Sequence, residues 1–111
     1  MTVICPRGNG PKYEVYIRYS YSMVKSEFIH LLIQEGYPEP VEVQRPSGHL
    51  DEHTHPFEVK ALVIEGSIDL IINGHTETFM PGDIFELDFE ELHAESYGPK
   101  GVKYLVSRLH G

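Results

Sequence analysis

The chain has 111 residues, enough for one domain with a core of its own and too few for two. Its 17 acidic and 9 basic residues give a net charge of −8, which should repel nucleic-acid phosphates and anionic membrane surfaces. We therefore expect neither nucleic acid nor a membrane as a partner. A membrane-spanning run of roughly 18 apolar residues and a signal-peptide pattern are both missing, and Cys5 is the single cysteine. We expect a cytoplasmic protein without an intrachain disulfide.

The first 22 residues are predicted to be an N-terminal extension. Residues 1–12 are rich in glycine and proline, as loops are, whereas the run 13–20 places alternate apolar residues on one face and predicts a strand. Such a strand could lie at the edge of a sheet or pair with a neighbouring subunit. On that basis we predict a homodimer.

Residues 23–40 are predicted to form a helix and a proline-rich connection. Apolar residues recur at helical spacing between Val24 and Glu35, and Gly36 stands where a C-terminal cap would be. Pro38 and Pro40 then prevent the helix from continuing. We expect this helix to pack on a sheet as a lid.

The remaining segment, 41–111, has the pattern of short strands joined by tight turns. The strands are expected at about 41–46, 58–65, 67–73, 75–80, 84–88, 93–97 and 102–109. Asn73-Gly74 is the strongest hairpin signal, because both residues tolerate the positive φ of a type I′ turn, and further turns are expected at 81–83 and 98–101. Both faces of the run 58–65 are apolar, which predicts a strand covered on both sides. The pattern indicates an all-β sandwich or small barrel.

Three histidines are candidate metal ligands. His53 and His55 are two residues apart, a spacing that sends both side chains to the same face of a strand, and His93 follows downstream. The alternative, three structural or solvent-facing histidines, stays open at this point. The other histidines are not expected to be ligands: His30, His49, His75 and His110.

These motifs resemble those of the cupin superfamily, whose members share a small double-sheet β-barrel. The first cupin motif runs from a glycine through His-x-His and a glutamate to a second glycine, and its positions here are Gly48, His53, His55, Val59 and Gly66. The second runs from Pro-Gly-Asp to a histidine and an asparagine, and its positions here are Pro81, Gly82, Asp83, Asp88, Glu90, His93 and Tyr97. The resemblance covers about 41–109, and 26–66 also resembles a group of small single-domain bacterial cupins. It implies a jelly-roll barrel, the double-stranded β-helix, over 41–111, with one short N-terminal helix.

The sequence departs from the family at the glutamate that metal-binding cupins use as a ligand, because Val59 stands there. The neighbouring Glu58 would point to the opposite face of a regular strand, and a bulge after Pro56 would be needed to turn it back. The resemblance implies one divalent transition metal, either zinc, nickel, iron or manganese. Its implied ligands are His53, His55 and His93, with Glu58 as an alternative fourth.

The implied function is a small metal-binding cupin whose three-histidine site faces a cavity for a small organic ligand. If it is an enzyme, the resemblance allows dioxygenase, isomerase or lyase chemistry. No residue is clearly a general base, and Glu58 and Tyr97 are the nearby candidates for a catalytic role. A non-catalytic ligand-binding or sensor module, with or without metal, is the alternative. The acidic stretch 83–95 is predicted to be a solvated loop and strand face.

Overall fold

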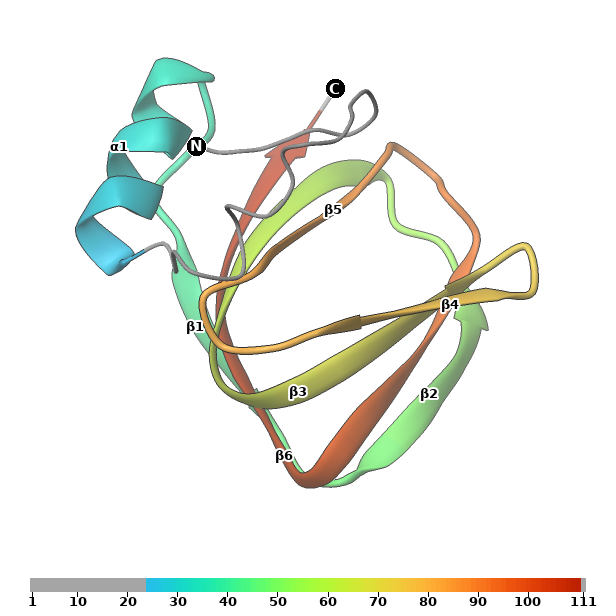
Figure 1. The fold of residues 1–111 in the computed structure, drawn as a ribbon. Helices are drawn as coiled ribbons and strands as arrows, with labels where there is room; N and C mark the ends of the chain where they lie inside the picture. Colours follow the sequence, from blue (N-terminus) through green and yellow to red (C-terminus); the bar gives the residue numbers. More distant parts are fainter. Residues whose placement is uncertain (1–23, 111) are drawn as a thin grey trace, which may run out of the picture.

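The structure is a computed structural model that describes residues 24–110 (Figure 1). Its elements are α1 (Lys25–Gln34), β1 (Val41–Arg45), β2 (Gly48–His53), β3 (Phe57–Ile72), β4 (His75–Phe79), β5 (Ile84–Leu87) and β6 (His93–His110). An all-β fold with one short helix is thereby confirmed. The strand predicted at 13–20 lies outside the described residues. Within the described range, no helix has the length and apolar character needed to span a membrane.

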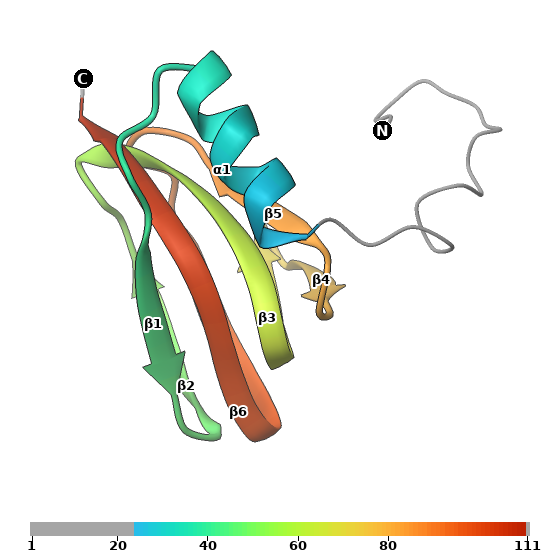
Figure 2. The ribbon, with the colours of Figure 1, turned by 90° about the vertical axis from the view of Figure 1, so that its left-hand side faces the viewer.

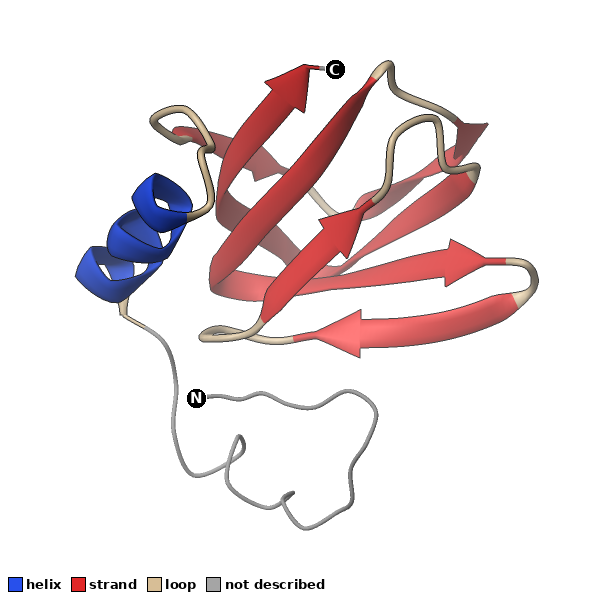
Figure 3. Ribbon diagram, turned by 90° about the horizontal axis from the view of Figure 1, so that it is seen from above, coloured by secondary structure: helices blue, strands red, loops and turns tan. Residues whose placement is uncertain are grey.

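Two long, bent strands form the centre of the fold. β3 and β6 pair antiparallel with each other, β1 and β2 pair with β6, and β4 and β5 pair with β3. Because both long strands bend, their two halves lie on different sides of the molecule, and the sheet wraps around an interior (Figures 1 and 3). The result is the jelly-roll barrel that the resemblance implied.

Glycines at the bends explain why each long strand was predicted as two strands. Gly66 in β3 has a φ of +74°, and a Cβ there would lie 2.0 Å from the backbone oxygen of Gly101 in β6. The register between β3 and β6 shifts on both sides of Gly66. The runs 58–65 and 67–73 are therefore halves of β3, and the predicted turn at 98–101 is a bend within β6. Pairing continues on both sides of each bend, which keeps the strands continuous.

The predicted hairpin is confirmed, whereas β2 was missed. Asn73 and Gly74 have φ values of +53° and +76°, and they connect β3 to β4 with Ile72 opposite His75. In β2, five of the six residues are exposed, so no alternation of buried apolar residues marks it in the sequence. Its pairing with β6 forms this strand.

The helix α1 covers the outside of the barrel, as predicted (Figure 2). At its beginning the carboxylate of Glu27 accepts a hydrogen bond from the backbone N–H of Val24, and after its last turn Gly36 adopts a φ of +81°. Its apolar face forms one cluster with the outer face of β3 and β6: Phe28, Leu32, Leu62 and Leu105. The barrel interior is filled by a separate cluster that includes Val59, Ala61, Val63, Phe85, Tyr104 and Val106. The prediction that 58–65 is covered on both sides is confirmed.

A buried lysine lies between the helix and the barrel. Lys60 is only 6% exposed, and its ammonium group donates a hydrogen bond to Glu35, directly after α1, and lies 2.9 Å from the carboxylate of Glu86 in β5. Burial by itself would lower the pKa of Lys60, but the hydrogen bonds to the two carboxylates, together with their charges, raise it overall. This charged group connects the end of the helix to the outer face of the barrel.

Candidate metal centre

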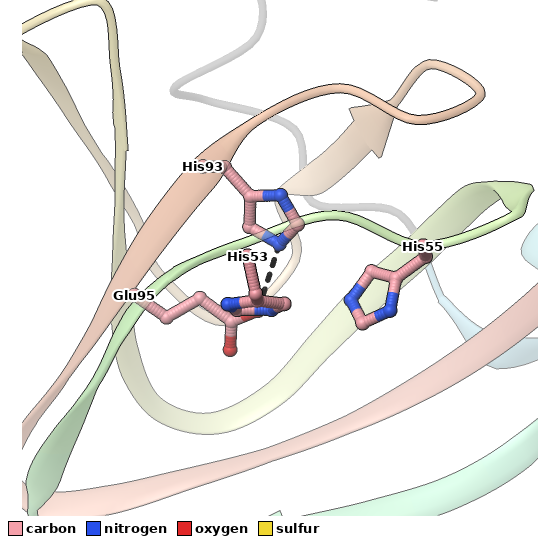
Figure 4. Close-up of side chains that lie close together, drawn as sticks. All are labelled: His53, His55, His93 and Glu95. Atoms are coloured by element: carbon pink, nitrogen blue, oxygen red, sulfur yellow. Dashed lines mark hydrogen bonds and ion pairs between the residues drawn. The ribbon is translucent and has the colours of Figure 1, made fainter.

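Three histidines and one glutamate come together where β2 meets the beginning of β6 (Figure 4). His53 is the last residue of β2, and His55 lies in the connection to β3. His93 and Glu95 are the first and third residues of β6. One potential ligand atom from each residue lies within 4.8 Å of all the others. These four residues are called the metal-site group below.

A bulge in β2 determines which of its residues faces the group. Between the pairs Leu50–Glu95 and His53–His93, β2 has one more residue than β6. In a regular strand Glu52 would lie opposite His93, and His53 would point to the other face. The bulge therefore brings the imidazole of His53, and not a carboxylate, beside His93.

Backbone carbonyl groups hold two of the imidazole rings. Nδ1 of His53 lies 2.7 Å from the oxygen of Asp51, and Nδ1 of His93 lies 2.9 Å from the oxygen of Glu91. A carbonyl oxygen can only accept, so these bonds assign a proton to Nδ1 in both rings. In the neutral rings, Nε2 then presents a lone pair to the centre of the group.

The carboxylate of Glu95 is buried beside the Nε2 atoms of His53 and His93. Glu95 is 9% exposed, and its Oε2 lies 3.1 Å from Nε2 of His93 and 3.5 Å from Nε2 of His53. Its Oε1 accepts a hydrogen bond of 2.8 Å from the hydroxyl of Tyr97. Burial, followed by the hydrogen bond and charge of Glu95, raises the pKa of Tyr97. The phenol therefore stays protonated and holds one carboxylate oxygen, leaving the other directed at the imidazoles.

This arrangement fits a metal ion. With bonds of about 2.1 Å, the ligand atoms of a transition-metal site lie about 3 to 4 Å apart. The two distances from Glu95 to the imidazoles fall in that range. Among the described residues, Nε2 of His53 is buried without a hydrogen-bond partner, and coordination to a cation would satisfy it. Imidazoles with a carboxylate suit the divalent ions of zinc, nickel, iron and manganese.

His55 is on the open side of the group. It is partly exposed, whereas His93 is buried. Its ring lies edge-on to His53 at a centroid distance of 4.7 Å and stacks on Phe57 at 5.1 Å. Burial lowers the pKa of His55, and the neighbouring imidazoles of His53 and His93 act in the same direction. The lowered pKa favours the neutral ring that a metal requires.

The structure brings together the three histidines that the sequence singled out and adds Glu95. Glu95 belongs to the acidic stretch predicted to be solvated, and for this residue the prediction is wrong, because its side chain points into the barrel and is buried. The alternation His93-x-Glu95-x-Tyr97 was the available signal, since it places all three on one face of a strand. Outside the metal-site group lie His30, His49, His75 and His110.

Glu58 does not lie with the histidines. It is exposed, and its carboxylate accepts a hydrogen bond of 3.2 Å from the hydroxyl of Tyr37 beside the helix. The register of β3 with β6 is regular from Phe57 to Val63, so the bulge that would have turned Glu58 inward does not occur. Val59 points into the barrel and is part of its core. The carboxylate nearest the histidines comes from β6 instead.

Comparison with known proteins identifies the fold. No protein-family model matches the sequence, and no curated protein matches it significantly. Similar solved structures include a cupin superfamily protein from Desulfitobacterium hafniense, with 16% identity, a TM-score of 0.54, and coverage of 63% of this chain and 62% of that one. The polyketide cyclase RemF from Streptomyces resistomycificus has 27% identity, a TM-score of 0.54, and coverage of 71% and 60%. The EutQ protein from Clostridium difficile has 14% identity, a TM-score of 0.57, and coverage of 71% and 61%.

The matched region spans about three fifths of each of these three proteins. The likeness lies in the barrel of antiparallel strands, and the fold is that of the cupin superfamily.

Proposed function

We propose that this protein is a small metal-binding cupin that holds one divalent transition metal with His53, His55, His93 and Glu95. The observation that carries the proposal is the buried Nε2 of His53, which has no hydrogen-bond partner among the described residues and lies beside the carboxylate of Glu95. Four ligands leave coordination positions for water or an organic ligand on an ion that accepts five or six. The carboxylate adds a negative charge to the site, so manganese and iron suit it as well as zinc and nickel.

The surrounding residues prepare the site for this role. A bound ion would supply Lewis acidity for polarising a carbonyl group or activating water. The carbonyl groups of Asp51 and Glu91 hold the rings of His53 and His93, and the hydroxyl of Tyr97 holds the carboxylate of Glu95. The hydroxyl of Tyr97, a candidate catalytic group, is already engaged as the donor of a hydrogen bond to Glu95. We therefore assign it a positioning role.

Metal analysis of protein that has never carried a metal-affinity tag tests the proposal. We expect about one equivalent of a transition metal in the wild type and in the control His75→Ala, whose side chain is exposed at the β3–β4 hairpin. The variants His53→Ala and His93→Ala should lose it while keeping the circular dichroism of a β-barrel. Metal content that is the same in all four proteins would refute the proposed function. Nothing in residues 24–110 favours the alternative, a non-catalytic ligand-binding or sensor module with or without metal.

We also propose that the protein is a cytoplasmic homodimer that binds a small organic ligand. The dimer is supported by the open edge of β1, which pairs with β6 alone among the described strands and has four exposed residues out of five. The ligand is supported by the partial exposure of His55 at the metal-site group. Light scattering at micromolar concentration should give the mass of two chains, and the mass of one chain would contradict the dimer.

A further inference from the structure

An arginine lies on the inner face of the barrel beside the open side of the metal-site group. Arg108 follows the same alternation along β6 as Tyr104 and Val106, whose side chains fill the interior. Its guanidinium carbon lies 5.7 Å from the centre of the Phe57 ring, and Phe57 stacks on His55 with an angle of 12° between the ring planes. This succession of side chains places a positive charge one aromatic ring away from the partly exposed His55.

Within residues 24–110, the guanidinium group of Arg108 forms no ion pair with a carboxylate. The ion pairs among residues 24–110 involve Lys60, Lys103 and histidines, and none includes Arg108. In a chain with 17 acidic residues, a guanidinium without a carboxylate calls for an explanation. The other arginine in the described range, Arg45, is exposed, whereas Arg108 is half-buried.

A carboxylate is the group that this arrangement suits. The planar guanidinium offers two parallel N–H groups that match the two oxygens of a carboxylate, and a ring beneath it limits its freedom. We propose that Arg108 binds the carboxylate of a small anionic ligand whose other end reaches the metal through the open side at His55. This inference rests on the proposed metal site. An uncharged ligand of the same shape would leave the guanidinium without a partner and should bind more weakly.

Binding of matched carboxylates and amides to the metal-loaded protein tests the inference. The protein is first titrated with Co²⁺, and pyruvate, pyruvamide, lactate and lactamide, each with a second oxygen that can reach the metal, are then titrated into the complex, with the visible spectrum of Co²⁺ and calorimetry as readouts. We expect the Kd of each carboxylate to be at least about ten-fold lower than the Kd of its amide. Arg108→Gln should weaken carboxylate binding by about ten-fold to a hundred-fold and leave amide binding and Co²⁺ affinity unchanged.

Lys103→Gln is the matched control, because it removes the same charge from the same strand but from the outer face, where Lys103 lies 3.6 Å from Glu65. It should bind carboxylates as the wild type does. If Arg108→Gln does not fold, Arg108→Lys replaces it: this variant keeps the charge without the paired donors and should weaken carboxylate binding by roughly three-fold to ten-fold.

Several results would overturn the inference while leaving the metal site intact: no carboxylate binding by the Co²⁺-loaded wild type, equal binding of carboxylate and amide, or equal losses in Arg108→Gln and Lys103→Gln. Unchanged carboxylate binding in Arg108→Lys, where that variant is the one tested, would also overturn it. Failure of the wild type to take up Co²⁺ in the first titration would instead refute the proposed function. The order of the two titrations keeps these failures distinct.

Discussion

Replacing Glu95 by glutamine should weaken metal binding strongly while preserving the fold. The carboxylate is 9% exposed, so water screens its charge little, and its Oε2 lies 3.1 Å and 3.5 Å from the Nε2 atoms of His93 and His53. In the metal-loaded protein the charge partner of this carboxylate is the bound cation, and removing one partner of a buried pair of opposite charges costs about 3 to 5 kcal/mol. That cost corresponds to an increase in the metal Kd of about a hundred-fold to several thousand-fold. The amide has nearly the same size, and its oxygen can still accept the hydrogen bond from Tyr97.

Competition with a chromophoric chelator measures this effect on untagged protein. Glu58→Gln is the matched control, since it makes the same chemical change at an exposed residue that is bonded to Tyr37 on the helix side of the barrel. We expect the Kd of the control to stay within about three-fold of the wild-type value, as for a surface substitution. Equal affinity of Glu95→Gln and wild type would refute the assignment of Glu95 as a ligand. A comparable loss in Glu58→Gln would refute the geometric reasoning behind it.

Three further predictions concern positioning and stability. Tyr97→Phe should weaken metal binding about ten-fold in the same titration, because Glu95 loses the bond that orients it, and an unchanged Kd would contradict the positioning role. Gly66→Ala should lower the free energy of unfolding in urea by on the order of 3 kcal/mol, because the added Cβ strains the positive φ and collides with backbone atoms. Gly74→Ala should lower it by only about 1 kcal/mol, because no atom lies within 4 Å of the added Cβ. Equal losses in the two variants would contradict the close approach at Gly66. Folding raises the pKa of Lys60, so its ion pairs stabilise the fold below the unfolded-state pKa and this contribution is lost as the pH rises through the folded-state pKa. The wild type should accordingly lose more stability than Lys60→Met between about pH 10 and pH 12 in urea titrations, and parallel losses would argue against the ion pairs.

Much of the architecture could be predicted because it depends on local chemistry. The helical spacing that ends at Gly36 predicted α1 to within one residue at each end, and the φ preferences of Asn73 and Gly74 predicted the β3–β4 hairpin. Apolar residues on both faces of 58–65 predicted a strand between a core and a covering layer, and that arrangement is observed. Each of these signals depends on a few neighbouring residues, so it can be recognised in the sequence alone.

The sequence also singles out the three histidines as candidate ligands, through their spacing and the motifs around them. Tertiary structure decided the rest of the site. The exposed strand β2 exists through its pairing with β6, and the bulge in that pairing turns His53 toward His93. The same pairing buries Glu95 inside the barrel, while the regular register of β3 leaves Glu58 outside. Register depends on backbone bonds between segments far apart in the chain, and local patterns contain no record of it. The alternation His93-x-Glu95 places these two side chains on one face of a strand, but the register of the folded barrel decides that Glu95, and not Glu52 or Glu58, lies beside the three histidines.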